Sequence, residues 1–174
     1  IAIGAKALQN NTTGNGNVSI GGDALRANTT AGLNSALGAY ALSTNTTGSE
    51  NVSIGYVSMY YNTTGIRNTA LGVGSLFSNT TANVNTAVGY AAMANNTTGY
   101  NNTAVGATAL NANTTGNNNS ALGVMALFAN TTGGENVAIG ENALRSNTTG
   151  SVNTSIGTSS LIANTTGEQN VAVG

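Results

Sequence analysis

The segment Asn85–Asn101, NTAVGYAAMANNTTGYN, is followed by seventeen residues that read almost the same, NTAVGATALNANTTGNN (Asn102–Asn118). The unit recurs along the chain without insertion, with Gly at its fifth position and an Asn-Thr-Thr triplet beginning at its twelfth. Its first position is occupied by Asn17, Asn34, Asn51, Asn68, Asn85, Asn102, Asn119, Asn136, Asn153 and Asn170. Self-similarity at a fixed period is the sequence signature of a stacked repeat architecture. Residues 1–174 therefore form a single continuous repeat array.

The repeat is too short and too rich in turn residues for a helical unit. Gly and Asn-Thr-Thr recur too often for a helix longer than about two turns, and such short helices are marginal in water. A strand plus a helix needs about 20 residues or more per repeat. We therefore predict an all-β fold, a parallel β-solenoid of the β-roll or β-helix type, with one 17-residue repeat per coil and about ten coils. Within a coil we expect a strand at positions one to five, a turn at the Gly, a second strand around positions eight to eleven, and a wider turn at Asn-Thr-Thr-Gly.

Two columns of the repeat are consistently apolar. Position four holds Ile, Leu or Val throughout, as in Val88, and position nine holds Leu or Met, as in Met93. We predict that both columns face the interior. Positions three and eight hold only Ala or Ser, which lets neighbouring backbones approach closely. Positions six, seven, ten, sixteen and seventeen vary freely, so we expect them to face solvent or a partner.

Both ends of the array follow the consensus, whereas solenoids normally end in atypical capping repeats. The sequence begins at repeat position two and stops at position five. We therefore expect the array to be a segment of a longer fibre.

Charge is scarce in this chain. Charged residues make up 5% of it, against roughly a quarter in typical globular proteins. The net charge of -1 supplies neither the basic surface that binds a phosphate backbone nor the polybasic cluster that binds anionic lipid. The apolar runs are far shorter than the roughly 20 residues that cross a bilayer. We therefore expect no nucleic-acid partner and no membrane insertion.

The acidic residues do not form a catalytic pattern. Acid-base and nucleophilic chemistry need titratable groups that converge. Glu50 and Glu135 share position seventeen but lie five repeats apart, about 24 Å at the spacing of stacked strands. Calcium-binding β-rolls need an Asp in each turn, where this chain has Asn-Thr-Thr. We predict that the chain is not an enzyme and that it has no cofactor or metal site.

The Asn-Thr-Thr column has two interpretations. Each triplet is an N-x-[ST] acceptor for N-glycosylation in an expected turn. Alternatively, the Asn side chains stabilise the turn and form a hydrogen-bonded ladder from coil to coil. The candidate glycosylation sites are Asn11, Asn28, Asn45, Asn62, Asn79, Asn96, Asn113, Asn130, Asn147 and Asn164.

The aromatic residues and the threonines offer further candidate surfaces. Tyr60, Phe77 and Phe128 share position ten and are a candidate inter-chain seam. The alternatives are a binding patch that also includes other exposed tyrosines, or aromatic residues scattered without a role. Threonine columns also suggest ice binding, although adjacent residues of an extended strand point to opposite faces and give no flat two-column surface.

Two segments carry a family resemblance. NVAIGENAL (Asn136–Leu144) and NTAVGYAAM (Asn85–Met93) resemble the SVAIG-type head repeats of trimeric autotransporter adhesins. The longer unit NTAVGYAAMANNTTG is similar to repeats of bacterial and phage tail-fibre proteins. The resemblance covers essentially the whole chain, and it implies a left-handed β-roll assembled as a trimer. The adhesin head repeat is shorter and lacks the Asn-Thr-Thr turn.

Together these features predict an extracellular structural fibre or filament protein, located outside the cell or on a cell or virion surface. It would supply length, stiffness and a repetitive surface that carries covalent glycans if the acceptor column is used. We expect it to self-associate as a homotrimer or a filament. The alternative is an adhesin or tail-fibre module that binds cell-surface or carbohydrate ligands, and a lesser alternative is an ice-binding solenoid.

Overall fold

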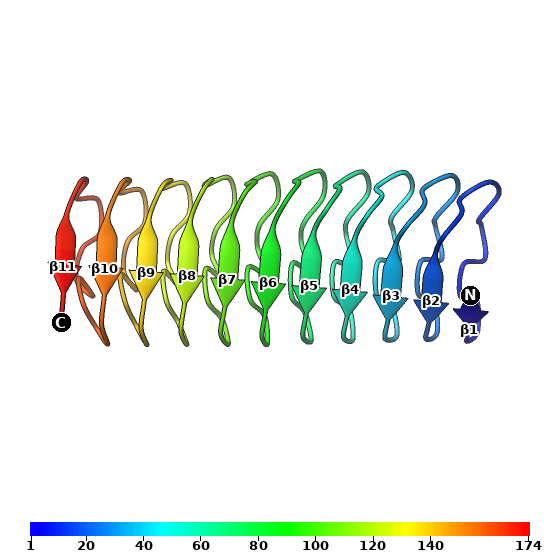
Figure 1. Cartoon of the computed structure of the whole chain (residues 1–174), viewed down its shortest axis with the longest axis horizontal. Coiled ribbons are helices and arrows are strands. Elements are labelled where there is room, and N and C mark those ends of the chain that lie inside the picture. The colour runs from blue at the N-terminus through cyan, green and yellow to red at the C-terminus, as the bar shows by residue number, and fades with distance from the viewer.

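A computed structural model, which describes Ile1–Gly174, shows a rod made of stacked coils (Figure 1). Eleven parallel strands form one sheet and lie side by side in chain order along the long axis. The predicted all-β parallel solenoid with a 17-residue coil is therefore confirmed. The strands are β1 (Ala2–Ile3), β2 (Val18–Ile20), β3 (Ser35–Leu37), β4 (Val52–Ile54), β5 (Thr69–Leu71), β6 (Thr86–Val88), β7 (Thr103–Val105), β8 (Ser120–Leu122), β9 (Val137–Ile139), β10 (Thr154–Ile156) and β11 (Val171–Val173).

Each residue of a strand lies beside its own copy in the next repeat. Ala87 of β6, for example, pairs with Ala104 of β7. The same 17-residue offset joins every pair of neighbouring strands. Any chemical property of one repeat position is therefore displayed as a straight column along the rod.

The predicted second strand around positions eight to eleven is wrong, because each coil contains one strand, at positions two to four. The backbone at positions six to eleven forms turns, in which positions seven and nine adopt left-handed φ angles, such as 49° at Ala91 and 53° at Met93. This segment still bonds to the next coil, since the Met93 N–H donates to the Ala109 carbonyl at 3.0 Å. The sign of φ alternates along this segment. This alternation, rather than strand geometry, lets the side chains of positions eight and nine both point inward.

One of the two apolar columns predicted to face the interior does so. Position nine is fully buried from Leu25 to Leu144, and it packs with the Ala residues of positions three and eight in one continuous core. Position four was expected inside but faces outward, and Leu37 and Leu71 are 46% and 44% exposed. Successive residues of a strand point to opposite faces, so a buried position three places position four outside.

The backbone conformation at position five requires glycine. Gly89 has a φ of 132°, which side-chain-bearing residues rarely adopt, and a methyl group there would lie 2.6 Å from the carbonyl oxygen of Gly106. This glycine lets the chain leave the strand while the coils remain in close contact.

Candidate functional site

The Asn residues of the Asn-Thr-Thr triplets lie inside the rod. The inner members of this Asn column, such as Asn96 and Asn113, are fully buried, and only Asn11 and Asn164 are partly exposed. Each side-chain amide donates to the Oδ1 of the Asn one coil earlier, at 2.8 to 3.2 Å, along the whole column. The same amide donates to the carbonyl three residues later, as in Asn113 to Gly116 at 2.9 Å. The ladder interpretation is therefore confirmed.

The candidate glycosylation sites are placed unfavourably for that modification. A sugar would attach to the side-chain nitrogen that makes both of these hydrogen bonds, in a region without solvent access. The folded coil therefore has no room for a glycan on the inner Asn residues of this column.

A second Asn ladder runs through position one. The backbone N–H of Asn102 donates to the Oδ1 of Asn85 at 3.0 Å, and the Asn102 side-chain amide donates to the Gly116 carbonyl at 2.9 Å. The Gly116 carbonyl also accepts the bond from Asn113, so the two ladders meet at position fifteen. Buried amides are costly unless they are paired, and this geometry pairs them in every coil.

The two threonines of each triplet have different environments. The first donates its hydroxyl to the backbone carbonyl of its copy in the next coil, as in Thr97 to Thr114 at 3.0 Å. The second, such as Thr98, is exposed and forms a single column. Only one threonine column therefore faces solvent at this edge of the coil.

The outer face of the sheet is apolar. We call it the aliphatic face, and its central column is position four: Ile3, Ile20, Leu37, Ile54, Leu71, Val88, Val105, Leu122, Ile139, Ile156 and Val173. Position two, which holds Thr, Ser, Val or, at Ile1, Ile, flanks it on the same side of the strands. All eleven members of the central column are partly or largely exposed. Soluble monomers rarely expose long continuous apolar surfaces, so this face is a candidate interaction surface.

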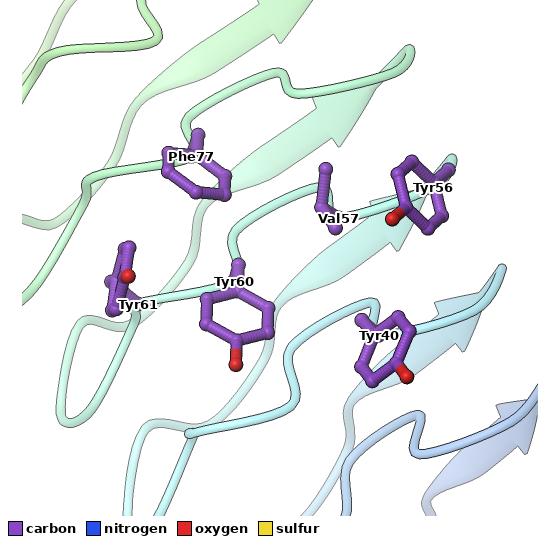
Figure 2. Close-up of a pocket in the computed structure, with 6 residues that line it drawn as sticks. All are labelled: Tyr40, Tyr56, Val57, Tyr60, Tyr61 and Phe77. Atoms are coloured by element: carbon purple, nitrogen blue, oxygen red, sulfur yellow. The ribbon is translucent and has the colours of Figure 1, made fainter.

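A second candidate surface is a shallow aromatic pocket with a volume of about 430 Å³ (Figure 2). We call it the aromatic site, and its lining residues are Tyr40, Tyr56, Val57, Tyr60, Tyr61 and Phe77. The Tyr60 and Phe77 rings stack with centroids 5.8 Å apart, because they occupy the same position in successive coils. Tyr61 stands edge-on to both rings, and Tyr56 stands edge-on to Tyr40.

The predicted seam is only partly assembled. Tyr60 and Phe77 are in contact, whereas Phe128 lies three coils beyond Phe77, about 14 Å away at the strand spacing. Ala94 and Asn111 occupy position ten between them. Position ten is therefore not a continuous aromatic seam. Tyr40 and Val57 were missed, although both fall at position seven in successive repeats and this spacing could have identified them.

Charged groups form only local pairs. Arg67 donates to Glu50 one coil away at 3.0 Å, and Arg26 donates to Asp23 at 3.2 Å. The hydrogen bond from Arg67 to Glu50, together with the negative charge of Glu50, raises the pKa of Arg67 above its ordinary value. No group of three or more His, Cys, Asp or Glu side chains converges on one point. The fold also contains no helix with the length and apolar character needed to cross a membrane.

Comparisons with known proteins add no assignment: no protein-family model, no curated protein and no solved structure matches the chain.

Proposed function

We propose that this chain is a structural rod that provides length and stiffness, and that copies of it associate side by side through the aliphatic face. The observation that carries the proposal is the straight exposed column at position four, which runs from β1 to β11. No other repeat position combines uniform aliphatic character with exposure.

Stiffness is supported by the way in which neighbouring coils are joined. Each interface between inner coils has the strand ladder, backbone bonds outside the strands, and the two Asn ladders. Fully satisfied buried networks of this kind rigidify a structure. Bending the rod would lengthen bonds on one side of every coil.

Association is supported by the dimensions of the aliphatic face. Ten steps between eleven strands give a length of about 48 Å, and positions two to four with their side chains give a width of about 10 Å. Two copies face to face would bury roughly 1,000 Å², which is the lower limit for a specific interface. A second copy also has the same strand spacing, so side chains of the two columns can interdigitate along the full length.

The narrower description is a fibre of the adhesin-head or tail-fibre type, located outside the cell or on a cell or virion surface. Its support is the resemblance carried by NTAVGYAAM (Asn85–Met93) and NVAIGENAL (Asn136–Leu144). An assembly of three copies around the aliphatic face is the form which that resemblance favours.

The test is sedimentation equilibrium of the purified chain over a range of concentrations, compared with the 17.1 kDa expected for one copy. We expect a dimer or trimer for the natural sequence. The triple variant Leu71→Lys/Val88→Lys/Val105→Lys places three charges on the aliphatic face and should sediment as a monomer.

The matched control is Thr81→Lys/Thr98→Lys/Thr115→Lys, which adds the same charges to the same three coils on the exposed threonine column. This control should associate like the natural sequence. A natural chain that stays at 17.1 kDa at every concentration, or a control that dissociates equally, contradicts association through this face.

A further inference from the structure

The aromatic site is a local departure from an otherwise regular rod. The side chains at repeat positions six, seven, ten and eleven are mostly small or polar elsewhere, as in Ala94 and Asn111 at position ten. The coil therefore folds without aromatic residues at these positions. Only between Tyr40 and Phe77 do the rings gather into a pocket.

These rings are not packed away as core. Tyr56 and Tyr61 are 55% and 48% exposed, and Tyr40 is 39% exposed. The edge-on pairs have interplanar angles of 78° to 88°, and all five rings line the same pocket. Figure 2 shows Val57 between the Tyr60–Phe77 column and Tyr56, so the rings stand on both sides of an aliphatic residue.

The chemistry of the lining selects for a neutral ligand with both C–H and O–H groups. The face of an aromatic ring carries partial negative charge and attracts C–H groups, which carry partial positive charge. The four tyrosines also supply hydroxyl groups that can donate or accept hydrogen bonds. A pyranose ring has these two features, a face of C–H groups and a rim of hydroxyls.

Other ligand classes fit the site less well. Nucleobases stack on aromatic residues, but the single-strand sites that bind them also have a positively charged groove, and no cationic residue lines this pocket. Charged small molecules would likewise find no partner of opposite charge. The volume of about 430 Å³ lies within the range of small-molecule sites, and its shallow shape leaves one side of a ligand in water, where the hydroxyls of a sugar remain solvated.

We propose that the aromatic site binds a neutral saccharide, stacked against Tyr60, Phe77 and Tyr56 and hydrogen-bonded by the tyrosine hydroxyls. This binding function goes beyond the structural rod and does not depend on it, because a rod without the site would still stack and associate. The aliphatic face lies on the strands, whereas the aromatic site lies on the turns that follow them.

Intrinsic fluorescence reports on this site directly. The chain has no Trp and six Tyr, and four of those six line the pocket. We would titrate the chain with three neutral hexasaccharides: one of β1,4-linked glucose, one of α1,4-linked glucose and one of β1,4-linked N-acetylglucosamine. Choline chloride serves as the cationic probe, because aromatic clusters can also bind quaternary ammonium groups. We expect a saturable change in tyrosine emission with at least one of the saccharides and none with choline.

The decisive variant is Tyr60→Asn/Phe77→Ala, since Asn and Ala already occur at position ten in neighbouring coils and should preserve the fold. Binding measured by calorimetry should weaken at least about tenfold, because two ring faces are lost. The matched control is Tyr90→Ala/Phe128→Ala, which removes one tyrosine and one phenylalanine outside the site and should bind normally.

The proposal is overturned if no saccharide binds at millimolar concentration, or if the decisive variant binds as well as the control. It is also overturned if choline alone binds, because the site would then be a cation cage. A decisive variant that loses self-association instead would identify the rings as a contact between copies. Circular dichroism of every variant separates these outcomes from loss of the fold.

Discussion

The side-chain amide of Asn113 donates a hydrogen bond to the Oδ1 of Asn96, one coil earlier, at 2.8 Å. Both residues are completely buried, and each also donates to the carbonyl that closes its own turn. One residue type thus closes a turn within its coil and joins that coil to the next. Several consequences of this arrangement can be measured.

Replacing Asn96 by Ala should destabilise the rod by about 2–4 kcal/mol, because it removes three side-chain hydrogen bonds, to Asn79, to Gly99 and from Asn113, and leaves the buried Oδ1 of Asn79 without its donor. Asn96→Asp keeps the shape but introduces a carboxyl into the same dry position. Burial raises the pKa of that carboxyl in the folded state above its unfolded value of about 3.9. The stabilising contribution of the proton is present at low pH and is lost as pH rises through the folded-state pKa.

Chemical denaturation should therefore show that Asn96→Asp is less stable at pH 7 than at pH 3, relative to the natural sequence at each pH. The control is Asn95→Asp at the neighbouring exposed position, which should show little such dependence. Equal behaviour of the two variants would contradict the ladder geometry.

Two glycines of the same coil should respond differently to alanine. Gly89→Ala introduces a side chain at a φ of 132° and 2.6 Å from the Gly106 carbonyl oxygen, so we expect a loss of about 3 kcal/mol or more. A methyl group at Gly99 would also press against the Gly116 carbonyl oxygen, yet Ala31 and Ala82 occupy that repeat position naturally.

The turn at position fifteen can therefore adjust, and we expect Gly99→Ala to change stability by less than about 1 kcal/mol. Thermal unfolding of the two variants provides the comparison. Similar melting temperatures for both variants would count against a special role for position five.

Leucines of a single coil test which column is inside. Leu76 is fully buried and Leu71 is 44% exposed, and both belong to the repeat that begins at Asn68. Leu76→Ala should cost about 2–5 kcal/mol because it opens a cavity, whereas Leu71→Ala should cost less than about 1 kcal/mol in the monomer. Urea denaturation at low protein concentration measures both values, and a larger loss for Leu71→Ala would reverse the assignment.

Glycosylation should distinguish buried from exposed acceptor sites. Asn95, Asn101 and Asn118 are exposed, and each begins an Asn-Asn-Thr or Asn-Asn-Ser acceptor sequence. After expression in a eukaryotic secretory pathway, we expect glycans at these three residues and none at the neighbouring Asn96 and Asn113 in folded protein. Peptide mass spectrometry before and after enzymatic deglycosylation locates the sugars. A folded rod with glycans on Asn96 and Asn113 would be incompatible with the ladder.

The period of the sequence predicts the coil and its parallel register, because each Asn and Gly must stack on its own copy. It does not predict which member of the pair Ala87–Val88 faces inward. Hydrophobicity favours Val88, but strand alternation allows only one of them inside, and the Leu or Met of position nine already fills the narrow interior. Ala92 and Met93 are both buried because φ changes sign between them. The inward-outward alternation of strand residues does not predict this arrangement.

Only part of the aromatic site could be predicted from the sequence. Tyr60 and Phe77 are seventeen residues apart, so their contact follows from the period alone. The inclusion of Tyr40 and Tyr56 depends on how positions six and seven turn toward position ten, and that geometry arises from the left-handed turn residues. Residue spacing predicts which side chains stack in a column. The angle between two columns depends on the backbone conformation of the turns.

The coil-to-coil bonds, which run along the long axis, also determine how the rod would respond to tension. A pull along that axis acts on one interface at a time, so coils would peel from an end while the remainder stays folded. Each released coil of seventeen residues adds about 50 Å, the difference between an extended chain and a rise of about 4.8 Å. A rod about 48 Å long thus holds nearly 600 Å of contour length, and it would act as an extensible tether that yields in equal steps.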